Sequence, residues 1–126
     1  MHYVSVENLS KSFGTKPLFK QISFHISEGD KIAFIAKNGS GKSTLLHLIG
    51  GLDKPSDGEV TLVGQRLSLM KDKQSTLLRR RNVGFVFQFF NLLPTLSAEE
   101  NVLLPVIIDG KNPRNYEERL TNVLDL

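Results

Sequence analysis

Residues 36–44 read Ala-Lys-Asn-Gly-Ser-Gly-Lys-Ser-Thr, and this stretch decides the fold. It matches the phosphate-loop pattern G-x-x-x-x-G-K-[ST] at every defined position except the first, where Ala36 replaces glycine. Gly39 and Gly41 permit the backbone conformations that turn successive N–H groups inward, and the positive N-terminal end of the following helix completes an anion-binding nest. The stretch therefore predicts a loop that holds phosphate groups.

Side chains of this loop have the chemistry of nucleotide binding. The ammonium group of Lys42 suits the β- and γ-phosphates, and the hydroxyl of Ser43 suits Mg²⁺, with Thr44 as a nearby donor. We therefore predict ATP with Mg²⁺ as the ligand. The predicted nucleotide-binding residues of the loop are Lys37, Asn38, Gly39, Ser40, Gly41, Lys42, Ser43 and Thr44.

The segments on either side of the loop fit a strand, a loop and a helix in succession. Residues 32–35 are apolar throughout, as expected of a strand buried on both faces. Residues 42–49 carry leucine and isoleucine at helical spacing, and a pair of glycines follows them. This context favours a nucleotide-binding loop over a glycine-rich turn that binds nothing.

A dinucleotide-binding loop is a competing interpretation. Gly39 and Gly41, with Glu59 further along the chain, loosely follow its pattern. We disfavour it because Thr44 stands where that pattern requires a third glycine, and because Lys42 would have no role there.

The rest of the chain alternates between segments of strand and helix character. Strands are predicted at residues 4–9, 18–26, 59–63 and 83–87, and helices at residues 75–81, at residues 97–108 and from Asn112 onward. Ser97 and Glu100 form a capping box at the start of the second of these helices, and Pro105 is a position at which this helix can bend. The order of elements predicts an α/β fold.

Composition narrows the class of protein. The chain has 126 residues, of which 40% are hydrophobic and 23% charged, which is typical of one globular domain. Its net charge of +3 gives no support to nucleic-acid binding, and the lack of cysteine excludes disulfides and thiolate metal sites. No apolar stretch approaches the roughly 20 residues that span a bilayer, and the N-terminus does not resemble a signal peptide. We therefore expect a cytoplasmic location.

Three further segments make the sequence resemble the ATP-binding domain of ABC transporters over its whole length. Phe13 lies where this family keeps an aromatic residue that stacks on adenine; a buried core position is the alternative for this ring. Residues 83–88 resemble the strand and Q-loop of the family, and residues 89–94 continue as in exporters of the lipoprotein-release and macrolide-efflux type. Residues 97–102 are similar to the start of the helical subdomain, which docks on the transmembrane partner.

The resemblance implies a P-loop NTPase fold of the ABC type, of which this chain represents the N-terminal part. Residues 1–95 would form the antiparallel β subdomain with the P-loop and Q-loop region, and residues 96–126 the start of the helical subdomain. Gln88 is implied as the catalytic residue that positions water, and as a contact of Mg²⁺ together with Ser43. A membrane permease is implied as partner, which would place the chain at the cytoplasmic side of the inner membrane.

Motifs that the family uses for hydrolysis are absent from the sequence: the LSGGQ signature, the Walker B strand ending in Asp-Glu, and a switch histidine after Gln88. Residues 106–109 superficially resemble Walker B, but Gly110 replaces the glutamate and Pro105 would interrupt a strand, so we predict a helix tail there. The chain alone is therefore expected to bind Mg-ATP but not to hydrolyse it. Without the Walker B strand, unpaired strand edges are expected to favour self-association.

Two alternatives stay open. Residues 28–33 and 36–38 look more like soluble, translation-associated ABC proteins of the duplicated type, which indicates either a composite chain or divergence within one family. A fragment of a ribosome-associated ABC protein is therefore the first alternative. The second is a small P-loop kinase, for which residues 79–81, a run of three arginines, are the candidates for a lid over the γ-phosphate.

Overall fold

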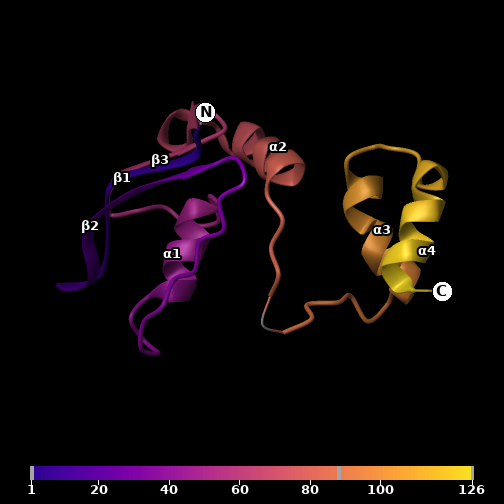
Figure 1. Cartoon of the computed structure of the whole chain (residues 1–126), viewed down its shortest axis with the longest axis horizontal. Coiled ribbons are helices and arrows are strands. Elements are labelled where there is room, and N and C mark those ends of the chain that lie inside the picture. Colours follow the sequence, from indigo (N-terminus) through magenta and orange to yellow (C-terminus); the bar gives the residue numbers. More distant parts are fainter. Residues whose placement is uncertain (1, 88, 126) are drawn as a thin grey trace. The chain divides into compact units, whose positions relative to one another are not determined.

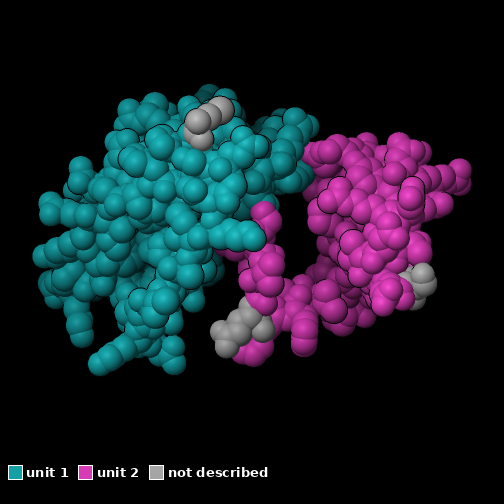
Figure 2. Space-filling view, in the orientation of Figure 1, with its two compact units in different colours: residues 1–83 teal, residues 84–126 magenta. Residues whose placement is uncertain are grey.

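The computed structural model describes residues 2–87 and 89–125. The chain forms two compact units, residues 1–83 and residues 84–126 (Figure 2). The first unit contains the sheet and the P-loop, and the second consists of irregular chain followed by helices. The sequence predicts a boundary between subdomains at residues 95 and 96. The division into compact units does not test this boundary, which stays a prediction.

An antiparallel sheet is the frame of the first unit (Figure 1). A turn at Gly14, with φ at 61°, joins its first two strands into a hairpin. The antiparallel β subdomain and the strands predicted in the first 26 residues are thus confirmed. In spatial order the strands are β2 (Lys16–Ser27), β1 (His2–Phe13), β3 (Asp57–Leu62) and β4 (Gln65–Arg66).

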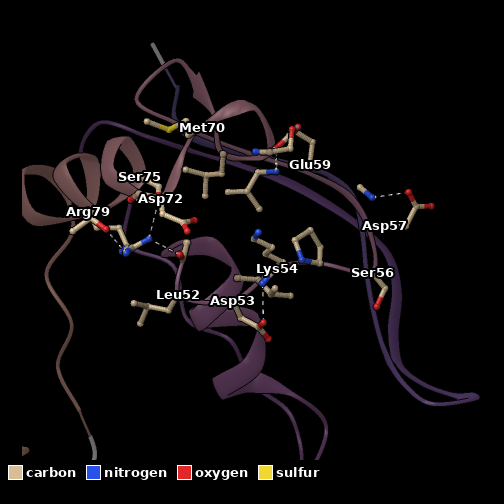
Figure 3. Close-up of a pocket in the computed structure, with 18 residues that line it drawn as sticks. Leu52, Asp53, Lys54, Ser56, Asp57, Glu59, Met70, Asp72, Ser75 and Arg79 are labelled. Carbon is tan, nitrogen blue, oxygen red and sulfur yellow. Dashed lines mark hydrogen bonds between the residues drawn. The ribbon is translucent and has the colours of Figure 1, made fainter.

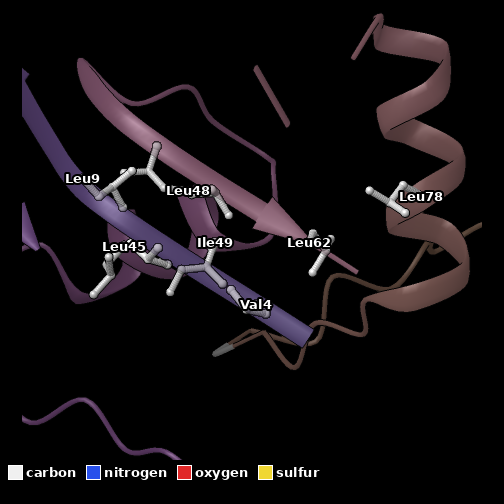
Figure 4. Packing of buried hydrophobic residues seen from close by; sticks show 9 residues of the cluster. Val4, Leu9, Leu45, Leu48, Ile49, Leu62 and Leu78 are labelled. Atoms are coloured by element: carbon white, nitrogen blue, oxygen red, sulfur yellow. The ribbon is translucent and has the colours of Figure 1, made fainter. Parts of the chain in front are cut away.

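One face of the sheet carries the hydrophobic core. On β1 a bulge at Asn8, with φ at 49°, follows Val6 and returns Leu9 to the inward face. α1 (Lys42–Ile49) packs on this face (Figure 4) and thereby fixes the P-loop, from which it starts, against the sheet. The buried cluster comprises Val4, Val6, Leu9, Leu45, Leu48, Ile49, Val60, Leu62 and Leu78.

A short helical segment, η1 (Leu67–Leu69), and α2 (Asp72–Asn82) complete the first unit. α2 confirms the predicted basic helix but begins three residues before Ser75, because the side chain of Gln74 accepts a hydrogen bond from Lys71 N at 3.0 Å and stabilises an earlier start. Its buried residue is Leu78, which joins the core cluster.

The second unit contains α3 (Ala98–Ile108), η2 (Pro113–Tyr116) and α4 (Glu117–Leu124). Ser97 Oγ accepts from Glu100 N at 3.1 Å, and Glu100 Oε2 accepts from Ser97 N at 2.7 Å, which confirms the capping box. α3 continues through Pro105 to Ile108, so the segment that resembles Walker B is a helix tail, as predicted. Within the residues that the structure describes, no helix is long and apolar enough to span a membrane.

Two of the predicted strands are wrong. Residues 32–35 and residues 83–87 are irregular, because apolar composition alone does not make a strand and no strand in the described part of the chain pairs with them. In the first segment Phe34 still packs on the core, with its ring 5.4 Å from that of Phe24, whereas Ile35 is 94% exposed. Self-association through unpaired edges stays a prediction.

Candidate functional site

The P-loop, residues 36–44, consists of a turn and the first three residues of α1. Gly39 and Gly41 have φ angles of 81° and 94°, in the left-handed region that favours glycine. Gly41 is the N-cap of α1, and its carbonyl accepts the first helical hydrogen bond, from Leu45 N at 2.8 Å. The N–H groups at the start of α1 are the donors that a helix leaves unpaired, so this end of the helix can receive an anion.

Ala36 departs from the loop pattern without backbone strain. It is not among the residues with positive φ, so its Cβ needs no unusual conformation. Its carbonyl oxygen accepts a hydrogen bond from Lys42 Nζ at 2.7 Å. Ser40 closes the other side of the loop, with its Oγ donating to Lys37 O at 2.6 Å. The ammonium group of Lys42 is thus held within the loop by a neutral acceptor.

An open depression of about 320 Å³ lies over the P-loop, and we call it the P-loop depression. Its lining combines an apolar wall from the β1–β2 hairpin with polar groups from the loop and the start of α1. The lining residues are Phe13, Leu18, Asn38, Gly39, Gly41, Lys42, Ser43 and Thr44. Of the residues predicted for the site, Lys37 and Ser40 belong to the loop but not to this lining, and Gln88 lies outside the described residues.

Phe13 is not part of the core, because this residue, at the end of β1, is 60% exposed. This observation excludes the buried position that the sequence left as an alternative. The ammonium group of Lys11 lies 5.5 Å from the centroid of the Phe13 ring. An exposed aromatic ring beside a phosphate loop has the geometry to stack on a flat ligand.

Leu18 is the lining residue that sequence reasoning missed. It lies close to Gly41: a Cβ built on that glycine would be 2.7 Å from Leu18 Cδ2. The hairpin is the feature that could have indicated Leu18, because a tight turn after Phe13 places the start of β2 beside the end of β1. The distance to the P-loop, however, has no signature in the local sequence.

A larger depression, of about 660 Å³, lies around the chain that follows α1 (Figure 3). Two of its charged groups are engaged with the protein: Arg79 Nη1 donates to Gly51 O at 2.8 Å, and Glu59 accepts from Arg66 Nε at 3.1 Å. Burial raises the pKa of Glu59, but its hydrogen bonds, above all those from Ser68, hold it below the usual value. Arg79 does not line the P-loop depression, so the kinase interpretation gains no support from it.

Comparison with known proteins shows which family the chain resembles in sequence. The sequence profile of the ABC transporter family matches residues 19–126. The lipoprotein-releasing system ATP-binding protein LolD of Cytophaga hutchinsonii is 40% identical over 117 residues, which cover 93% of this chain and 53% of that protein. LolD of Legionella pneumophila is 42% identical over 123 residues, with 94% and 54% covered.

Solved structures agree with the sequence relatives. The dimeric structure of MJ0796, a bacterial ABC transporter cassette, superposes with a TM-score of 0.84 at 38% identity, covering 97% of this chain and 54% of that one. The same cassette in a post-hydrolysis state bound to ADP and phosphate gives a TM-score of 0.82 at 39% identity. The chain thus spans about half the length of the relatives that it matches.

Proposed function

The chain belongs to the ABC transporter family, and we propose that it holds Mg-ATP in the P-loop depression as the nucleotide-binding part of a transporter ATPase. The observation that carries this proposal is the composition of that depression. Helix-terminal donors and Lys42 line it together with the exposed ring of Phe13. A nucleotide carries charged phosphates and a flat base, so its site needs polar donors beside an apolar surface.

The residues present suit Mg²⁺ bound in company with phosphates. Ser43 belongs to the lining, and its hydroxyl offers the oxygen ligand that Mg²⁺ prefers. Among the described residues no group of three histidine or acidic side chains offers a separate cage. Mg²⁺ is usually bound through few protein ligands plus substrate phosphates, so Ser43 would hold it, with Gln88 proposed as a second contact. The ion would neutralise phosphate charge when bound.

Lys42 is placed to exchange partners when a nucleotide binds. Its hydrogen bond to Ala36 O keeps the ammonium group at the loop, and phosphate oxygens offer charged acceptors in place of this neutral one. The ammonium group therefore already lies at the loop before a phosphate binds.

The proposed assembly is an exporter of the lipoprotein-release type, with a membrane permease as partner. The relatives named above are ATP-binding proteins of such a system. In the second unit, Phe89 and Phe90 are 74% and 91% exposed, and apolar residues this open are typical of a surface that a partner covers. We accordingly propose a location at the cytoplasmic side of the inner membrane.

Exchange of Phe13 for alanine tests the proposed contact between this ring and the base of the nucleotide. We expect the affinity for Mg-ATP to fall about five- to tenfold, since the base loses its stacking platform. The affinity for inorganic triphosphate should stay unchanged, because the loop and α1 are intact. Isothermal calorimetry with both ligands measures this difference. A parallel loss for the two ligands would show that Phe13 supports the fold instead of the base.

We further predict that the chain alone does not turn ATP over at an enzymatic rate. Lys42, Ser43 and Gln88 can position phosphate, metal and water, but the sequence contains neither a Walker B glutamate nor the signature motif. The assay is phosphate release at saturating Mg-ATP, with Lys42→Ala as the control for contaminating ATPases. Turnover near about 1 s⁻¹ that disappears in the control would contradict the prediction and point to an overlooked carboxylate, with Asp109 the first to examine.

A further inference from the structure

The end of β1 is fastened to the loop that follows α1, residues 53–56. Lys11 Nζ donates to Lys54 O at 2.7 Å and lies 3.0 Å from Asp53 Oδ2. Beside this contact, Ser12 N donates to Ser56 Oγ at 3.0 Å. Because α1 starts at the P-loop and ends just before this loop, one short helix connects the phosphate cradle to the strand that carries Phe13.

Lys11 is the centre of this attachment. Its side chain is only 13% exposed, which is low for a lysine at the surface of a sheet. The hydrogen bond from Lys11, together with that from the backbone of Lys54, holds the pKa of Asp53 below its usual value, so the carboxylate is charged at neutral pH. Two acceptors of this protein, Lys54 O and the Asp53 carboxylate, engage the ammonium group, and Lys11 does not line the P-loop depression.

The same ammonium group lies 5.5 Å from the centroid of the Phe13 ring, within the range of a cation–π contact. A cation at one face of a ring occupies that face and restrains the ring. A flat ligand can then stack only on the other face. Phe13 lines the P-loop depression, so its restraint bears on the part of the ligand that reaches it.

We propose that Lys11 is a positioning residue of the nucleotide site: anchored by Asp53 and Lys54, it covers one face of Phe13 and leaves the other to the base. The inference rests on the proposed binding of Mg-ATP and adds a residue that does not touch the nucleotide. Replacing Lys11 should therefore change the affinity for Mg-ATP only when the Phe13 ring is present. A change that acted through folding alone would not depend on that ring.

The test compares Lys11→Met with Lys11→Arg, each in the full chain and in the Phe13→Ala background. Calorimetry with Mg-ATP and with inorganic triphosphate gives the affinities. We expect Lys11→Met to weaken Mg-ATP binding about two- to fivefold, with triphosphate unchanged, and Lys11→Arg to keep the parent affinity. In the Phe13→Ala background Lys11→Met should have no further effect. Lys20→Met, which removes an exposed lysine from β2, is the matched charge control.

Asp53→Asn provides a second variant if Lys11→Met does not fold, as judged by thermal unfolding. It weakens the anchor but leaves Lys11 and the ring in place, and it should reduce Mg-ATP affinity in the same selective way. Equal losses with and without Phe13, or a loss for triphosphate, would overturn the role of Lys11. A parent chain that binds ATP and responds to Phe13→Ala but not to Lys11→Met would overturn this inference alone. A parent chain that binds no ATP would overturn the proposed function as well.

Discussion

Replacing Lys42 with alanine should weaken the binding of Mg-ATP roughly ten- to a hundredfold. The change removes a charge-assisted hydrogen bond to phosphate, worth about 1.5–3 kcal/mol, from a side chain that already lies at the loop. Inorganic triphosphate should lose affinity to the same extent, because Lys42 addresses the phosphates and not the base. Phe13→Ala, in contrast, is expected to weaken the binding of Mg-ATP alone.

The measurement is calorimetric titration in Mg²⁺ buffer, and Lys31→Ala is the matched control. Lys31 precedes the loop, is exposed and does not line the P-loop depression, so its loss removes the same charge from the same region. A general effect of net charge would weaken both variants alike. If Lys42→Ala bound ATP as tightly as the parent, the proposed phosphate cradle would be refuted.

The local features of the site could be predicted from the sequence because their causes are local. The backbone at positions 39 and 41 has the left-handed conformation that favours glycine. The leucines at helical spacing predict α1. Ser97 and Glu100 fix the start of α3 by hydrogen bonds within one turn. Each of these features depends on residues only a few positions apart.

The features that could not be predicted from the sequence depend on contacts between segments that are distant along the chain. Residues 32–35 have the composition of a buried strand, but a strand also needs a neighbour, and composition does not reveal whether one is present. The contact of Leu18 with the P-loop follows from the hairpin register and the position of α1 together. Lys11 and Asp53 meet only because the loop after α1 returns to β1.

Because of these contacts between distant segments, the β1–β2 hairpin is part of the site. The hairpin supplies Phe13 and Leu18, which form the apolar wall of the P-loop depression. Glycine at position 41 is therefore needed for two reasons, the backbone angle and the close approach of Leu18. Substitutions at the two glycines of the loop can separate these reasons.

Gly41→Ala should lower the free energy of unfolding by about 2–4 kcal/mol, the sum of left-handed strain and the displacement of a packed side chain. Its new Cβ would lie 2.7 Å from both Cγ and Cδ2 of Leu18, and 3.2 Å from Phe19 Cδ1. Gly39→Ala is the matched variant. Its φ of 81° brings comparable strain, but nothing lies within 4 Å of its Cβ, so it should cost only about 1–2 kcal/mol.

Urea unfolding of both variants, alone and combined with Leu18→Ala, separates strain from crowding. Leu18→Ala removes the atoms that the new Cβ meets, so its own cost should be smaller in the Gly41→Ala background than in the parent, whereas the Gly39→Ala background should leave that cost unchanged. Equal stability of the two glycine variants would mean that Leu18 does not approach the P-loop this closely. The apolar wall of the P-loop depression would then consist of Phe13 alone, and the selectivity for a base would depend on that ring and on the lysine that restrains it.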